Sequence, residues 1–144
     1  MAETAKAMWF VIMSHLETYL DSYTSATVSQ GFARGETYPA VVPAVRLYRR
    51  GEPDLDIFTR AKGTLEITME IWVGNDDASP KEGNEALAIL EEEVRQALIK
   101  WYPQAMADLK IKITDISFSG IHGDSENYRP HAMATYGVRV KWAK

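Results

Sequence analysis

The stretch 63-GTLEITMEIWVGNDDASPKEGNEALAILEEEVRQALIKW-101 places a strand pattern directly before a helix pattern, and this succession decides the fold. Its apolar residues first fall on every second position: Leu65, Ile67, Met69, Ile71 and Val73. Because successive side chains of a strand point to opposite faces, this alternation predicts a strand over residues 64–73. The other face of that strand, with Glu66, Glu70 and Trp72, is mostly polar.

The second half of the stretch predicts an amphipathic helix. Ser79 suits the N-cap, Pro80 the first helical position, and Glu82 completes a capping box. Apolar residues then recur at three- and four-residue steps: Leu87, Leu90, Val94, Ala97, Leu98 and Trp101. We expect Glu91 and Arg95 to pair on the outer face and Pro103 to end the helix.

The residues before this stretch predict a helix, a loop and a strand. Helical spacing of apolar residues over positions 3–23 predicts an opening helix, with His15 facing solvent. The small polar residues of 22–35 predict a loop. Residues 41–50 predict a strand that pairs only after Pro43, since proline lacks a donor and belongs at an edge or a strand start.

A projecting hairpin is expected over residues 46–60, with a short strand or extended arm at 55–59. Two further strands follow the second helix, over 111–120 and 132–142, separated by a polar loop from His122. The alternation of the first of them slips, which predicts a β-bulge near Asp115.

This order of elements predicts one α+β domain over residues 1–144. Its core is a largely antiparallel sheet of four to five strands, with two helices packed on one face.

Composition excludes several classes of protein. Hydrophobic residues make up 46% and charged residues 25% of the chain, which argues against disorder and against a membrane protein. The absence of cysteine excludes disulfides, thiol nucleophiles and thiolate metal sites. The N-terminal residues lack an export-signal pattern, so we expect a cytosolic protein.

Charge offers little attraction to nucleic acid, because the net charge is −4. The basic residues that cluster are Arg46, Arg49, Arg50, Arg60 and Lys62. They alternate with acids and are expected to be solvated strand ends, so no sequence-specific nucleic-acid binding is predicted.

The sequence predicts no catalytic, cofactor or metal site. His122 and Asp124 flank a glycine that could aim both at one point, but no further ligand stands at metal spacing. Asp76 and Asp77 lack the pattern of a calcium loop and are expected to favour the helix N-terminus. Phosphate loops and nucleophile elbows are missing from the sequence.

Aromatic residues and arginines suggest a contact surface instead, since both are enriched at protein interfaces. Trp72 lies on the polar face of the central strand and Tyr48 in the expected hairpin, so both are candidates for exposure. The predicted interface residues are Tyr48, Arg49, Arg50 and Trp72. The alternative is that loops of the same chain cover this sheet face.

The order and length of the elements resemble the tail terminator and tail completion proteins of long-tailed bacteriophages and prophages. The likeness covers most of the chain, from the opening helix through the arm at 41–50, the strand 62-KGTLEITMEIWV-73 and the helix over 85–101 to the closing strands. It implies a protein that is not an enzyme, has no cofactor, and forms a ring, by resemblance a hexamer, that caps the tail tube.

By the same resemblance, its partners are further copies of itself, a tail tube protein and a head connector protein. Its place is the virion, or the bacterial host cytoplasm during assembly. Two alternatives stay open from the residues alone. One is a small-molecule-binding or enzymatic domain that uses His122, Asp124 and His131, and the other is a general dimerisation module.

Overall fold

The computed structural model describes residues 5–31, 39, 41–54, 61–74, 80–124 and 131–144, with the backbone alone at 80, 121–124 and 131. The elements along the chain are α1 (Met8–Tyr23), β1 (Thr27–Gly31), β2 (Ala44–Gly51), β3 (Lys62–Gly74), α2 (Pro80–Leu109), β4 (Lys112–Asp124) and β5 (His131–Ala143).

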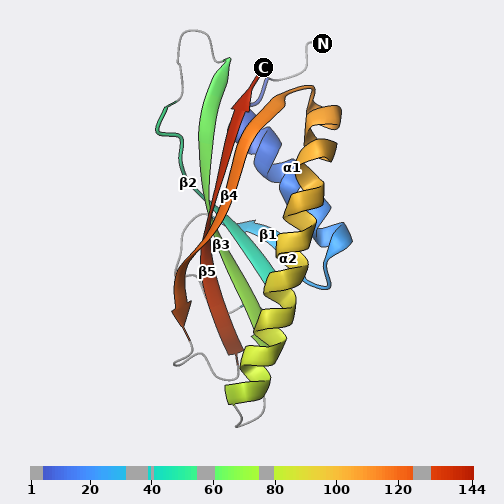
Figure 1. Cartoon of the computed structure of the whole chain (residues 1–144), viewed down its shortest axis with the longest axis vertical. Coiled ribbons are helices and arrows are strands. Elements are labelled where there is room, and N and C mark those ends of the chain that lie inside the picture. Colours follow the sequence, from blue (N-terminus) through green and yellow to red (C-terminus); the bar gives the residue numbers. More distant parts are fainter. Residues whose placement is uncertain (1–4, 32–38, 40, 55–60, 75–79, 125–130) are drawn as a thin grey trace.

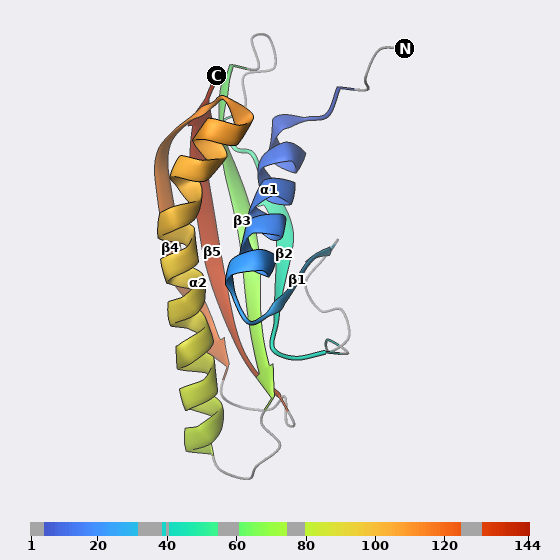
Figure 2. The ribbon, with the colours of Figure 1, turned by 90° about the vertical axis from the view of Figure 1, so that its right-hand side faces the viewer.

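The strands form one five-stranded sheet in the order β1-β2-β3-β5-β4. All neighbours pair antiparallel except β1 and β2, which run parallel. Both helices pack against the same face of this sheet (Figure 1, Figure 2). The predicted α+β class and the largely antiparallel sheet are therefore confirmed.

The apolar face of β3 forms the centre of the core, as its alternation predicts. Leu65, Met69 and Ile71 are fully buried beneath the helices. Leu16 of α1 and Trp101 of α2, both fully buried, belong to the same cluster. At roughly 1.5–3 kcal/mol for each large apolar side chain, this burial is the main source of stability for the sheet and helices together.

The predicted loop at 22–35 is wrong in part, because β1 lies within it. Its five residues pair in parallel with β2, and the backbone N–H of Thr27 donates to the carbonyl of Pro43 at 3.0 Å. Only Val28 of β1 is buried, so the short polar sequence gives little apolar alternation to read. β2 is consequently an inner strand, and it begins to pair at Ala44, directly after Pro43, as predicted.

The end of α2 also differs from the prediction, because the helix continues through Pro103 to Leu109. A proline inside a helix costs about 3 kcal/mol through a lost hydrogen bond and a clash. Trp101 and Ala105 on either side of it are fully buried, so packing of the apolar face offsets that cost. The helix begins at Pro80 as predicted, and Glu82 lies in its first turn, whereas Ser79 lies outside the described residues.

The bulge predicted near Asp115 is confirmed by a shift of register between Ile113 and Asp115. A second shift follows between Gly120 and His122, and β4 continues to Asp124. The predicted loop from His122 therefore begins too early. The short strand expected at 55–59 lies outside the described residues. The hairpin expected at 46–60 does not project at its start, because Arg46 to Tyr48 belong to β2 and pair with a strand on each side.

Candidate interaction surface

The two aromatic residues predicted as exposed contacts are buried. Trp72 and Tyr48 are each 3% exposed, so the prediction of their exposure is wrong. Both lie on the face of the sheet that points away from the helices, where Trp72 packs with Ala44 and Met133. A partner cannot reach these side chains without a change in the conformation of the subunit.

The polar groups of this buried cluster satisfy one another. The Glu70 carboxylate, 4% exposed, accepts hydrogen bonds from the Tyr48 hydroxyl at 3.0 Å and from Trp72 Nε1 at 3.2 Å. Burial, followed by the charge of Glu70, raises the pKa of Tyr48 to about 12. A buried carboxylate is costly unless it is hydrogen-bonded, so these three residues stabilise a face that alternation alone suggests is solvated.

The two arginines predicted in the interface are exposed. The guanidinium carbon of Arg49 lies 4.2 Å from the centroid of the Trp9 ring, and its Nη2 donates to Glu52 at 3.1 Å. Its side chain is still 42% exposed. Arg50 is also exposed and lines a shallow hollow on the helix-free face of the sheet together with Glu66 and Arg139.

An exposed aromatic ring, Phe10, adjoins the Trp9 ring on which Arg49 stacks. Phe10 meets Trp9 edge-on, with 5.8 Å between the ring centroids, and Lys6 Nζ lies 5.8 Å from the centroid of Phe10. We call Lys6, Trp9, Phe10 and Arg49 the Phe10 patch. Sequence reasoning missed Phe10, although its place off the apolar stripe of the opening helix is a signal that could have found it.

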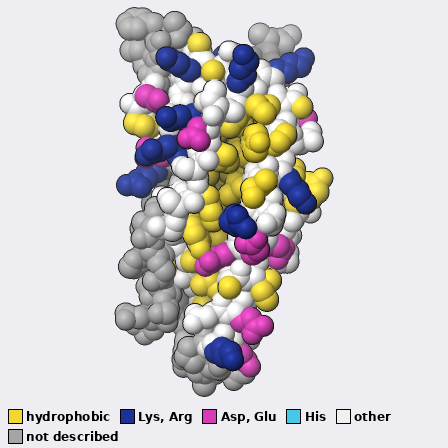
Figure 3. Space-filling model, in the orientation of Figure 1, with side chains coloured by type: hydrophobic (Ala, Val, Ile, Leu, Met, Phe, Trp, Pro, Cys, Tyr) yellow, Lys and Arg dark blue, Asp and Glu magenta, His cyan; other side chains and the backbone are white. Residues whose placement is uncertain are grey.

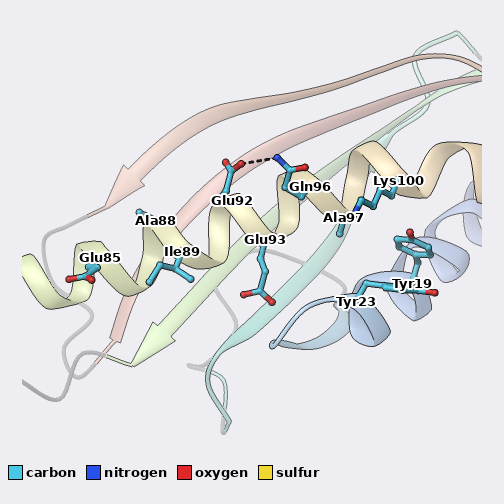
Figure 4. Close-up of a pocket in the computed structure, with 10 residues that line it drawn as sticks. All are labelled: Tyr19, Tyr23, Glu85, Ala88, Ile89, Glu92, Glu93, Gln96, Ala97 and Lys100. Carbon is cyan, nitrogen blue, oxygen red and sulfur yellow. Dashed lines mark hydrogen bonds between the residues drawn. The ribbon is translucent and has the colours of Figure 1, made fainter.

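A groove of about 640 Å³ lies between the C-terminal end of α1 and one side of α2. Figure 4 shows Tyr19 and Tyr23 on the α1 side, opposite Ala97 and Lys100 of α2, with Ile89 farther along α2. The two tyrosine rings stack with 4.4 Å between their centroids. We call this the α1–α2 groove. Tyr23 is 65% and Ile89 59% exposed, which makes apolar surface available to a partner.

The rim of the α1–α2 groove is acidic. Glu85, Glu92 and Glu93 line it, against one lysine, Lys100. Hydrogen bonds from Arg95, and then from Gln96, lower the pKa of Glu92 to about 2, so this carboxyl is ionised at neutral pH. The groove therefore presents apolar surface beside the acidic side chains of α2.

A chain of hydrogen bonds fixes α1 against α2 beside the groove. Trp101 Nε1 donates to His15 Nδ1 at 3.0 Å, and His15 Nε2 lies 2.8 Å from a carboxylate oxygen of Asp108. With Nδ1 acting as the acceptor, the proton of the neutral ring belongs on Nε2, which donates to Asp108. The hydrogen bond from His15, followed by that from Gln104, lowers the pKa of Asp108. The predicted solvent-facing role of His15 is thus wrong, since it joins the two helices.

The opposite side of α2 faces β4. Figure 3 shows hydrophobic side chains along this boundary, with acidic side chains across α2 below them. Phe118 and Tyr136 stack there with 4.3 Å between ring centroids. Burial, and then hydrogen bonding to Glu91, raises the pKa of Tyr136. The pairing predicted for Glu91 and Arg95 is wrong, because Arg95 instead pairs with Glu92 at 2.8 Å.

The histidines considered for chemistry lie at one end of the sheet. The Cα atom of His122 is opposite Thr135, that of Asp124 is opposite Met133, and that of His131 is opposite Gly74. Within the described residues, no group of three or more histidine, aspartate or glutamate side chains is arranged to hold a metal ion.

None of the helices in the described part of the chain has the length and apolarity needed to cross a membrane.

Comparison of the sequence with known protein families and with curated proteins finds no match.

Proposed function

We propose that this chain is a structural tail protein of a phage or prophage, of the tail terminator or tail completion type. Several copies form a ring that caps the tail tube and joins it to the head. Its partners are other copies of the chain, a tail tube protein and a head connector protein. It acts by binding alone, without catalysis or a cofactor.

Two unlike exposed surfaces on one subunit carry this proposal. The α1–α2 groove is apolar and acidic, whereas the Phe10 patch is aromatic and basic. A ring built by head-to-tail contacts needs two different surfaces that fit each other, whereas a two-fold dimer uses the same surface twice.

The helices and the strands of the subunit also differ in charge. The two helices contain eight acidic and three basic side chains, while the five strands contain seven basic and four acidic ones. Surfaces of opposite charge on one subunit favour ordered head-to-tail association and disfavour contacts between like surfaces.

The first experiment measures the mass of the purified chain by light scattering over a concentration series, with negative-stain electron microscopy of each fraction. We expect a discrete oligomer and rings of uniform diameter. Adding a tail tube protein encoded in the same genome should give tubes capped at one end. A chain that stays monomeric at high concentration and with the tube protein would refute the proposal. A stable dimer without rings would favour a general dimerisation module.

A further inference from the structure

We propose that the α1–α2 groove of one subunit receives the Phe10 patch of a second copy of this chain. This inference rests on the proposed function, because it names the contact through which neighbouring subunits of the ring meet. The Phe10 ring is the apolar part that enters the groove, and Lys6 and Arg49 are the cations that meet its acidic rim.

The choice of Phe10 follows from the large exposed apolar residues. In the described part of the chain they are Phe10, Tyr23, Val41, Ile89, Ile99 and Tyr102. Tyr23 and Ile89 belong to the groove itself. Among the others, Phe10 is the one for which the structure records a cation on its ring, with Lys6 Nζ 5.8 Å from the centroid. Aromatic residues and arginine are enriched at protein interfaces.

Charge complementarity identifies the occupant of the groove. Its rim has three carboxylates against one ammonium group, and Arg95 pairs with one of them, Glu92, so the rim keeps a net negative charge. Lys6 brings to it a cation with no ion pair in the described part of the chain, and Arg49 brings a guanidinium that also pairs with Glu52. Arg49 is already oriented for this role, because stacking on Trp9 and the hydrogen bond to Glu52 hold its guanidinium in place while 42% of the side chain stays exposed. Little side-chain entropy remains to be lost on binding.

The two surfaces cannot meet within one subunit. Phe10 lies in the first turn of α1 and Tyr23 is its last residue, about 20 Å apart at the rise of a helix. A contact between them must therefore join two copies. Since patch and groove differ, each subunit still has one free patch or groove after the first contact, and the series ends only when a ring closes.

A matched pair of isoleucines tests the groove. Ile89 and Ile99 are both on α2 and are 59% and 51% exposed, but only Ile89 lines the groove. We expect Ile89→Asp to weaken self-association at least tenfold in sedimentation equilibrium, and Ile99→Asp to leave it unchanged. Phe10→Ala should weaken it as strongly as Ile89→Asp. Circular dichroism of each variant verifies that it is folded.

Charge reversal tests the pairing itself. Lys6→Glu places a carboxylate on the patch, and Glu85→Lys places a cation on the rim, both at exposed positions. Each variant alone should associate several-fold more weakly than the unaltered chain. An equimolar mixture should recover most of the loss, because the carboxylate introduced into the patch of one variant then meets the ammonium group introduced into the rim of the other, while the reciprocal contact is the native one.

The outcomes separate the two proposals. If the unaltered chain forms rings that Ile89→Asp, Phe10→Ala and the charge reversals leave intact, the patch-in-groove contact is refuted and the ring stands. If the unaltered chain forms only closed dimers and Ile89→Asp dissociates them, the contact stands and the ring is refuted. An Ile89→Asp chain that keeps its rings yet loses the tail tube protein would assign the groove to that partner, against this inference. A monomeric unaltered chain refutes both.

Discussion

The two faces of the sheet are stabilised in different ways. Beneath the helices, Leu65, Met69 and Trp101 form a continuous apolar core in which shape and volume decide stability. On the opposite face, Trp72 packs with Ala44 and Met133. Trp72 and Tyr48 there donate hydrogen bonds to the buried Glu70 carboxylate. Polar substitutions on the first face should destabilise the fold strongly, and the cost of a smaller side chain there depends on the size of the cavity that it leaves. The second depends on keeping Glu70 paired.

The largest expected effect tests the helix-covered face. Trp101→Ala removes a fully buried ring and leaves a cavity between α1, α2 and the sheet, so we expect a loss of about 3–5 kcal/mol in the free energy of unfolding. Denaturation in urea measures it. Trp101→Phe is the comparison, since it removes the same hydrogen bond to His15 but keeps an aromatic ring and so loses a smaller volume. Equal losses in both variants would mean that the hydrogen bond, and not volume, dominates this face.

A smaller loss is expected on the opposite face. Tyr48→Phe preserves the ring but removes one of the donors to Glu70, which should lower the free energy of unfolding by about 1–3 kcal/mol. A change near zero would show that Glu70 does not depend on Tyr48, and the contrast between the two faces would fail.

The same variant has a signature in alkaline solution. The pKa of Tyr48 is raised from 10.0 to about 12 in the folded chain, so the folded state holds this proton more tightly than the unfolded state. Its contribution to stability is complete below pH 10 and is lost as the pH rises toward 12. Denaturation curves between these values should show a steeper loss for the unaltered chain than for Tyr48→Phe. Tyr136 titrates in both chains and so cancels from the comparison.

The smallest expected effect uses two glycines. A Cβ atom at Gly31 would stand 2.4 Å from Cε1 of Tyr48, whereas a Cβ atom at Gly51 meets nothing within 4 Å. We therefore expect Gly31→Ala to displace the Tyr48 ring and cost about 1 kcal/mol more than Gly51→Ala. Thermal unfolding of the two variants measures the difference. If both melt together, β1 does not restrain Tyr48 as closely as the register suggests.

The sequence was sufficient for the helix-covered face because its signal is local. The alternation of β3 and the capped stripe of α2 each occupy consecutive residues, and their burial follows directly. The bulge near Asp115 was also readable, since an extra residue changes the parity of every later side chain.

The opposite face was misread because alternation reports which side chains share a face, not whether that face is covered. Glu70 and Trp72 look like surface residues until Tyr48, brought alongside by the pairing of β2 with β3, supplies a further hydrogen bond. The candidate site was missed for the same reason. Tyr23 and Ile89 form the groove only after α1 and α2 pack together, and Arg49 was the one predicted contact that lies in the Phe10 patch.

The strand order has a consequence for how the chain is made. β3 and β4 do not pair with each other, and β5, the last strand, lies between them and pairs with both. Synthesis proceeds from the N-terminus, so β3 and β4 are both made before β5, the strand that pairs with each of them. Folding of this sheet therefore cannot be completed before its last strand is made, and nascent chains stalled before His131 should remain sensitive to protease.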